Sequence, residues 1–198
     1  MFIELTDHLR CPADHPEQYL VLLPGIMAER SVRSGDLGCP VCGRTYQVAD
    51  GVVDFGGAPG AEPLPSALDA DGMLALSGLN GPGGYLALVG GAAHAWRELA
   101  SLLPGVGLVG INPPASLGDE PGFSVLRGST IPLKSNSMRG VVLGPGFGGD
   151  AHWASEALRV ILPGLRIVGE GAEPTLANLE VLGSAGGGWV GAKVRNRP

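Results

Sequence analysis

The chain has 198 residues and a formal net charge of −6, with 44% hydrophobic and 16% charged residues. This length suits one medium domain, or one domain plus a small module, and the composition is too apolar for a disordered segment. The two lysines and eleven arginines form no run, whereas a duplex-binding surface needs clustered cations to neutralise phosphates. Direct nucleic-acid binding is therefore not expected.

No apolar run reaches the ~18 residues that a membrane-spanning helix needs, so no membrane partner is expected. The N-terminal stretch MFIELTDHLRC carries acidic residues where a signal peptide has a basic flank and an apolar centre. The three cysteines are an odd number in metal-like spacing. This favours a reducing, cytoplasmic setting over a disulfide framework.

Composition divides the chain into two parts joined by a short linker. Residues 1–56 hold all three cysteines and end in TYQVADGVVDF, whose alternating residues around Asp50-Gly51 predict a hairpin. Residues 57–66, GAPGAEPLPS, are rich in Gly, Pro and Ala and predict a linker. Residues 67–198 form the second part.

Strand-like and helix-like segments alternate from residue 67 onward. Helical periodicity predicts helices over 67–79, 92–103 and 151–162, the last with Asp150 as its N-cap. Short apolar runs predict strands at 85–89, 106–111, 124–126, 140–143 and 165–168, and a closing hairpin of 179–182 and 189–194. Apolar strands that alternate with helices are typical of a parallel sheet covered on both faces. We therefore expect a doubly wound, mostly parallel α/β domain of the Rossmann-like type.

The cysteines follow the spacing of a metal site. The CPVCG stretch of residues 39–43 places two thiolates on one turn, and Cys11 supplies a third. A closed tetrahedral zinc site needs a fourth ligand, which is either Asp14 or His15. Structural zinc sites take imidazole nitrogen more readily than carboxylate, so the favoured ligand set is Cys11, His15, Cys39 and Cys42. The alternatives are buried apolar cysteines without a metal and, less favoured because no base lies nearby in the sequence, a catalytic thiol.

Residues 1–56 resemble a family of small zinc-ribbon proteins that act as activating partners of methyltransferases. That family has an apolar N-terminal helix leading into CPxC, a variable insert, a second CxxC and a tail of the form CGxxYPIxDGIPxL. The tail is matched here by residues 42–55, CGRTYQVADGVVDF, while Asp14 stands in place of the family's second cysteine. The resemblance implies a zinc-ribbon-like β module that offers a strand edge to a protein partner, here the second part of its own chain.

Residues 67–194 resemble class I S-adenosylmethionine-dependent methyltransferases. In that family the first strand runs into an acid-x-Gly-x-Gly-x-Gly loop, whose glycines let the backbone approach the methionine part of the cofactor. The matching positions here are Leu88, Gly90, Ala92 and His94. The family's second strand ends in an acid that binds both ribose hydroxyls, and Asn112 stands there. Its third strand leads to Gly-Asp, which contacts the adenine amino group, and the pair here is Gly128-Ser129.

Two later segments keep the family pattern. LPFxDxSFDxVV is matched by residues 131–142, IPLKSNSMRGVV, and EALRVLRPGGRLV by residues 156–168, EALRVILPGLRIV. Positions that build the fold are thus kept, while the acidic cofactor positions have become Leu88, Asn112 and Ser129. Each lost hydrogen bond to a charged group costs about 1.5–3 kcal/mol. We therefore expect weak or absent binding of S-adenosylmethionine at the matching positions, Gly90, Ala92, Asn112 and Ser129.

The stretch NPPA, residues 112–115, looks like the Asn-Pro-Pro-aromatic catalytic motif of amino-methylating relatives, but it lacks the aromatic residue. In those enzymes the motif follows the fourth strand, where this chain has GPGF at residues 144–147. No catalytic residue is assigned. Just beyond lie three residues that could supply a base and a stacking surface, although a capped helix start is the simpler interpretation: Asp150, His152 and Trp153.

These patterns favour a non-catalytic protein, in which a zinc-ribbon-like module is fused to a methyltransferase-like domain and the whole acts as a scaffold or partner subunit. The alternative is an active S-adenosylmethionine-dependent methyltransferase with its activator fused in cis. A third hypothesis is a pocket that takes another small ligand.

Overall fold

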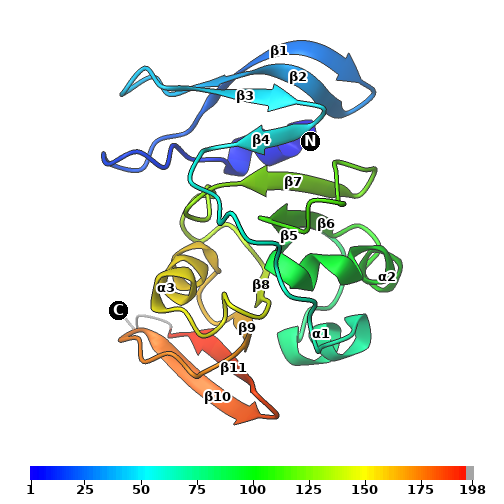
Figure 1. The fold of residues 1–198 in the computed structure, drawn as a ribbon, viewed down its shortest axis with the longest axis vertical. Coiled ribbons are helices and arrows are strands. Elements are labelled where there is room, and N and C mark those ends of the chain that lie inside the picture. Colours follow the sequence, from blue (N-terminus) through cyan, green and yellow to red (C-terminus); the bar gives the residue numbers. More distant parts are fainter. Residues whose placement is uncertain (195–198) are drawn as a thin grey trace.

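The computed structural model describes residues 1–194 (Figure 1). Their strands are β1 (Val21–Ala28), β2 (Ser31–Gly38), β3 (Thr45–Ala49), β4 (Val52–Asp54), β5 (Tyr85–Val89), β6 (Gly107–Ile111), β7 (Phe123–Arg127), β8 (Gly140–Leu143), β9 (Arg166–Glu170), β10 (Leu179–Ala185) and β11 (Gly188–Lys193). The helices are α1 (Ala70–Ser77), α2 (Trp96–Leu102) and α3 (Ala151–Val160), with 3-10 helices η1 (Ile3–His8) and η2 (Gly90–Ala95). The strands form one sheet in the order β1-β2-β3-β4-β7-β6-β5-β8-β9-β11-β10. Residues 195–198, the end of the expected α/β domain, lie outside the described residues.

The centre of the sheet is parallel and doubly wound. Strands β7, β6, β5, β8 and β9 pair in parallel. Counted from β5, their order is 3-2-1-4-5, which is that of a doubly wound sheet. The predicted closing hairpin of β10 and β11 adds an antiparallel edge beside β9. The sheet as a whole is therefore mixed, and the doubly wound α/β fold expected from the sequence is confirmed for its centre.

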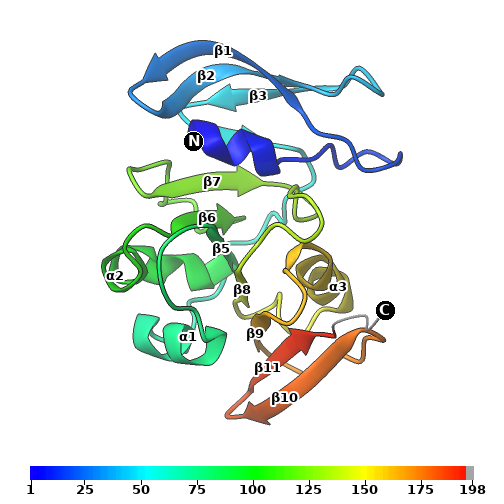
Figure 2. The same ribbon diagram turned by 180° about the vertical axis from the view of Figure 1, so that it is seen from behind.

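Helices cover both faces of these central strands (Figures 1 and 2). Leu86 and Leu88 of β5 belong to one buried cluster with α1 and α2, whereas Ala87 and Val89 belong to another with Trp153 of α3. Successive side chains of a strand point to opposite faces, so a strand covered on both faces reads as a continuous apolar run. Within residues 1–194, no helix is both long and apolar enough to cross a membrane.

Two predicted helices start later than their sequence pattern suggests. The segment predicted as one helix over 92–103 begins as η2 and becomes α-helical only at Trp96. The chain turns sharply at Gly90, with φ of 63°, and a 3-10 turn is a common way to enter an α-helix. The helix predicted over 67–79 begins at α1, because the side chain of Asp69 caps it by accepting the Gly72 N–H at 2.8 Å.

Residues 1–56 continue the same sheet. Strands β1 to β4 pair antiparallel, and the hairpin predicted at Asp50-Gly51 is confirmed, with φ of 50° and 78° at its turn residues. β4 then pairs in parallel with β7, and Val52 lies opposite Val125. The strand edge of this part is thus paired with the second part of its own chain, as the family resemblance implied.

Two features of residues 1–56 differ from expectation. The apolar N-terminal helix of the family pattern is the 3-10 helix η1, whose Leu5 shares a buried cluster with Trp153 of α3. Figure 2 shows η1 between the labelled strands β3 and β7, running roughly along them. The β1–β2 hairpin was not predicted, because Pro24 and Gly25 interrupt the alternation and most of β1 is exposed.

A partly buried ion cluster ties residues 1–56 to α3. The Glu156 carboxylate accepts hydrogen bonds from Arg159 at 2.8 and 2.9 Å and from the Ile131 N–H at 3.1 Å. It lies 3.8 Å from the guanidinium of Arg10, and its side chain is 14% exposed. Burial by itself would raise the pKa of Glu156, but the hydrogen bonds and charge of Arg159, with Arg10 and the Ile131 amide, outweigh burial and hold the pKa below its ordinary value of 4.5.

Glu156→Gln is expected to lower the free energy of unfolding by about 1–3 kcal/mol. It removes the carboxylate nearest to the guanidiniums of Arg10 and Arg159, which then keep only the more distant Glu17, at 3.9 and 3.7 Å. Since the folded-state pKa is lowered, this contribution is fully present above pH 4.5 and is lost as the pH falls through the folded-state value. Urea unfolding of both proteins between neutral and acidic pH measures the effect. The advantage of the wild type must shrink at the acid end, and a constant advantage would contradict this role for the carboxylate.

Glu120→Gln is the matched control. Glu120 pairs with Arg97 at 2.6 Å, but both side chains are exposed, at 41% and 63%. Exposed pairs contribute little to stability, so this variant should change the free energy of unfolding by about 0.5 kcal/mol at most.

Candidate functional site

The four favoured metal ligands come together in residues 1–56, with ligand atoms all within 4.8 Å of one another: Cys11, His15, Cys39 and Cys42. Two of them lie on the segment after η1 and two on the turn between β2 and β3. The Sγ atoms of Cys11 and Cys42 are 3.7 Å apart, and the Sγ of Cys39 lies 3.4 Å from Nε2 of His15. We call these four residues the Cys3His cluster.

These distances fit one tetrahedral zinc ion. Zn–S bonds of about 2.3 Å and Zn–N bonds of about 2.0–2.1 Å put two sulfurs roughly 3.8 Å apart, and a sulfur and a nitrogen roughly 3.5 Å apart. The 3.7 Å between the sulfurs of Cys11 and Cys42 is far longer than the ~2.05 Å of a disulfide bond. Three thiols and one imidazole also make up a donor set of the closed, structural type.

His15, and not Asp14, reaches the thiols. Nδ1 of His15 lies 2.7 Å from the carbonyl oxygen of Pro16. A carbonyl can only accept, so Nδ1 carries the proton and Nε2 presents its lone pair toward Cys39. Metal-binding histidines commonly donate their second N–H to a carbonyl in this way. Of the two fourth ligands that the sequence left open, the geometry therefore fits His15.

Backbone amides and burial shift the pKa values of the thiols in opposite directions. Burial alone would raise the pKa of Cys39, but the N–H groups of Cys42 and Val41 outweigh it and lower the pKa to about 6. Burial raises the pKa of Cys11, whose Sγ lies 3.4 Å from the hydroxyl of Tyr46. Tyr46 was not predicted as part of the site, because its contact with Cys11 depends on how β3 packs and no local pattern signals it.

The second candidate site is the crevice at the carboxyl ends of β5 and β8, where the strand order reverses. Doubly wound sheets bind ligands at this switch point, and the methyltransferase resemblance places Gly90 and Ala92 there. Both residues are buried. A Cβ on Gly144 would lie 2.9 Å from the backbone N of Ala92, so the loops after β5 and β8 are in contact. A Cβ on Gly90 would collide with the ring of Phe147, which therefore covers this glycine.

Residues 58–65, which we call the strap, cross the same crevice. The carbonyl oxygen of Leu64 packs so closely on Gly91 that any Cβ there would collide with it. The Glu62 carboxylate accepts the N–H of Ala115 at 3.1 and 3.3 Å. The space left is a cavity of about 140 Å³, well below the roughly 300–1,000 Å³ of small-molecule sites. The sequence predicted these residues only as a linker, because their composition does not show which surface they cross.

A buried carboxylate holds the chain just after the strap. Glu170, at the end of β9, is 7% exposed. It accepts hydrogen bonds from the hydroxyl of Ser66 and, at 2.7 Å, from the N–H of Ala67. No local pattern in the sequence marks Glu170, since its partners lie about a hundred residues away.

Asn112 uses its side chain to hold the end of β7. Its Nδ2 donates to the carbonyl of Gly128 at 2.8 Å, and its Oδ1 accepts the N–H of Gly128 at 2.9 Å. The residue is 5% exposed and has φ of 47°, a conformation that Asn tolerates better than most residues. Both ends of the amide are thus engaged by backbone. Ser129 is exposed, and its backbone N–H donates to the Gly56 carbonyl at 3.1 Å.

The residues beyond β8 are engaged in structural contacts. As predicted, Asp150 caps α3 and accepts the N–H groups of His152 and Trp153 at 2.8 and 3.1 Å. Nε2 of His152 donates to the carbonyl of Ser129 at 2.9 Å. Trp153 packs edge-on against Phe147, with ring centroids 4.9 Å apart. This geometry supports the capped helix start over a catalytic base.

No protein-family model matches the chain, and no curated protein matches it. Among solved structures it is similar to a chain of the complex between the Haloferax volcanii Trm112 methyltransferase activator and a protein described as a methyltransferase (23% identity, TM-score 0.42, 50% of each chain covered). It is also similar to geranyl diphosphate methyltransferase in complex with GPP and sinefungin (18%, 0.43, 50% of this chain and 43% of that one). A third is the antibiotic-resistance methyltransferase Kmr (13%, 0.45, 66% and 95%). The chain thus spans half or less of the first two structures, and likenesses this weak do not assign it to a family.

His15→Ala is expected to lower the zinc content of the purified protein, whereas Asp14→Ala should keep the wild-type content, because only His15 reaches the thiols. Metal analysis after dialysis against a weak chelator measures the zinc content. Cys39→Ser, which removes one of the thiols, is the control variant that should lose zinc. A strong chelator should also lower the unfolding midpoint of the wild type, since a structural metal binds the folded chain alone. Equal zinc in the wild type and in both variants would refute a ligand at position 14 or 15.

Asn112→Asp restores the acid of the family pattern, yet it is expected to lower the free energy of unfolding by about 1–3 kcal/mol. The new carboxylate would face the Gly128 carbonyl without an N–H to donate to it. Ser129→Asp, at the neighbouring exposed position, is the matched control and should cost about 0.5 kcal/mol at most. Urea unfolding compares the two, and an Asn112→Asp protein more stable than the wild type would contradict the stabilising role of the amide pairing with Gly128.

Proposed function

We propose that this chain is a non-catalytic, methyltransferase-like protein that acts as a scaffold or partner subunit. The observation that carries the proposal is the filled crevice, with the Leu64 carbonyl packed on Gly91 and the Phe147 ring packed on Gly90. The family resemblance places the methionine part of S-adenosylmethionine at these glycines. The residues present do not fit that cofactor, because backbone and an aromatic ring occupy its place.

The lost acids support the same proposal. Leu88 is fully buried among apolar side chains, and the amide of Asn112 is engaged by Gly128. Ser129 carries no charge. Each missing hydrogen bond to a carboxylate costs about 1.5–3 kcal/mol. If the three losses are independent, they lower affinity for the cofactor by several powers of ten.

We further propose that the Cys3His cluster holds one structural zinc ion. Its four protein ligands fill a tetrahedral coordination shell, so the metal would have no open position for a substrate. Zinc would act there as a cross-link between the segment after η1 and the turn between β2 and β3. Residues 1–56 and 67–194 then form two structural units joined by residues 57–66, with the pairing of β4 and β7 as their interface.

The partner role is supported by the outer edge of the sheet. Within the described chain, β1 pairs only with β2. Its side chains Val21, Leu23 and Ile26 are 53%, 64% and 64% exposed. A row of exposed apolar side chains on an edge strand is typical of an interaction surface.

An active methyltransferase with its activator fused in cis is the second candidate. The observation that favours it is the parallel pairing of β4 with β7. This pairing puts the zinc-ribbon-like part on the strand edge of the methyltransferase-like part, as the family resemblance expects of an activator. The two candidates differ in whether the crevice can admit S-adenosylmethionine.

Calorimetry with S-adenosylmethionine separates the two candidates. We expect no saturable heat from the wild type, with an established methyltransferase as the positive control in the same buffer. A second variant, in which a Gly/Ser sequence of equal length replaces residues 58–65, should also give none, because the acids remain absent. Circular dichroism shows whether this variant is folded.

Micromolar binding by the wild type would refute the non-catalytic proposal. Binding by the Gly/Ser variant alone would show that the strap, and not the loss of acids, closes the crevice. That result would also favour the second candidate.

A further inference from the structure

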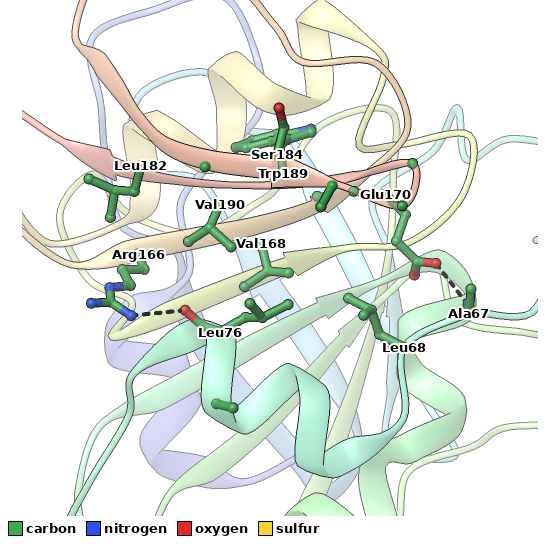
Figure 3. A pocket seen from close by; sticks show the side chains of 17 residues that line it. Ala67, Leu68, Leu76, Arg166, Val168, Glu170, Leu182, Ser184, Trp189 and Val190 are labelled. Carbon is green, nitrogen blue, oxygen red and sulfur yellow. Dashed lines mark hydrogen bonds between the residues drawn. The ribbon is translucent and has the colours of Figure 1, made fainter.

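An apolar groove of about 490 Å³ lies between α1, β9 and the β10–β11 hairpin (Figure 3). Val168 and Val190 line its floor, Leu68 and Leu76 its α1 side, and Leu182 the hairpin side. Its volume lies within the roughly 300–1,000 Å³ of small-molecule sites. The groove shares no lining residue with the loops that form the crevice at β5 and β8, so it is a separate site.

Strand register explains why this face of the sheet is hollow. Val190 pairs with Val168 and Gly188 with Glu170, and Gly183 of β10 pairs with Val190. Directly paired residues point to the same face. The positions beside Val190 on this face, Gly183 and Gly188, therefore carry no side chain. Their absence leaves the space that forms the groove.

The two ends of the groove differ in charge. Arg166 is exposed at one end, where its guanidinium makes a single hydrogen bond within the described chain, at 3.4 Å to the Leu76 carbonyl. No carboxylate of residues 1–194 lies within 4.0 Å of that guanidinium. At the other end, the carboxylate of Glu170 is buried and already accepts two hydrogen bonds. Figure 3 shows these two side chains at opposite ends of the groove.

We propose that the groove binds a monocarboxylate with an extended apolar tail. The carboxylate pairs with Arg166, whose planar guanidinium can donate two parallel hydrogen bonds to it, and the tail lies over Val168 and Val190. Arg166 is the one cationic side chain among the described residues that line the groove, so a single negative charge fits better than a phosphate dianion. Glu170 repels a second acidic group, which sets the direction of the ligand.

The span between Arg166 and Glu170 along β9 limits the length of the ligand's apolar tail. Arg166 and Glu170 are four residues apart on the strand, a span of about 13 Å at the usual rise per residue. This distance fits the tail of a medium-length acyl chain. The proposal does not depend on the state of the methyltransferase crevice, because the two sites share no residue.

Calorimetric titration with decanoate, below its micelle concentration, tests the proposal. We expect saturable binding of decanoate by the wild type. Acetate, which has the head without the tail, and decyltrimethylammonium, which has a similar tail with a cationic head, should not bind. Equal binding of decanoate and decyltrimethylammonium would overturn the role of Arg166.

Two variants test the two halves of the site. Arg166→Met keeps an unbranched apolar stem but removes the charged guanidinium, and it should weaken decanoate binding about tenfold or more. Gly183→Leu should abolish binding by filling the groove. A Cβ at Gly183 meets no atom within 4 Å and its φ is not positive, so the variant should fold. Arg97→Met, on the exposed face of α2, is the matched control and should bind as the wild type does.

Absence of saturable decanoate binding by the wild type would overturn the proposal, as would unchanged affinity in Arg166→Met. Sedimentation of the same proteins tests a second copy of the chain as the occupant. A wild-type dimer that Gly183→Leu dissociates, without decanoate binding, would also overturn the proposal. If Gly183→Leu fails to fold, Arg166→Met and the two control ligands still decide the outcome.

Discussion

The parallel pairing of β4 with β7 determines the path of the chain that follows. Parallel strands end at the same edge of a sheet, so β4 delivers the chain to the carboxyl ends of the central strands. From there it must reach α1, which packs against β8 and β9. Residues 57–66 therefore cross the point where the strand order reverses. The contact of Leu64 with Gly91 and the small size of the remaining cavity both follow from this path.

Two polar clusters reinforce that pairing from the side of the N-terminal part. Arg10 approaches Glu156 of α3, and the next residue, Cys11, belongs to the Cys3His cluster. One short segment thus carries both an ion pair to the second part of the chain and a ligand to the proposed metal. A metal that orders Cys11 would also limit the motion of Arg10, so cross-linking within residues 1–56 would stabilise their contact with α3.

The structure has two hollows, the groove beside β9 and the crevice at β5 and β8, and the strap crosses the crevice. At the crevice, backbone of the strap packs on Gly91, which has no side chain to hold it away. At the groove, glycines on the β10–β11 hairpin leave the floor open. Glu170 connects the two places, because its carboxylate holds Ser66 and Ala67 just after the strap and also ends the groove. Its burial is sustained by these two hydrogen bonds, which replace the water it loses.

The sequence by itself determined the features that depend on neighbours along the chain. The strands at 85–89 and 140–143, the hairpin at Asp50-Gly51 and the cap at Asp150 agree with the structure, because periodicity, turn chemistry and capping act over a few residues. Cysteine spacing likewise indicated a metal site but left Asp14 and His15 open. Only the tertiary structure brings His15, and not Asp14, to the thiols, places the strap over Gly91, pairs the amide of Asn112 with Gly128 and opens the groove. Each of these features depends on contacts between segments that are distant in the sequence, or on how a loop folds back on itself. Local patterns of residue types do not specify such contacts.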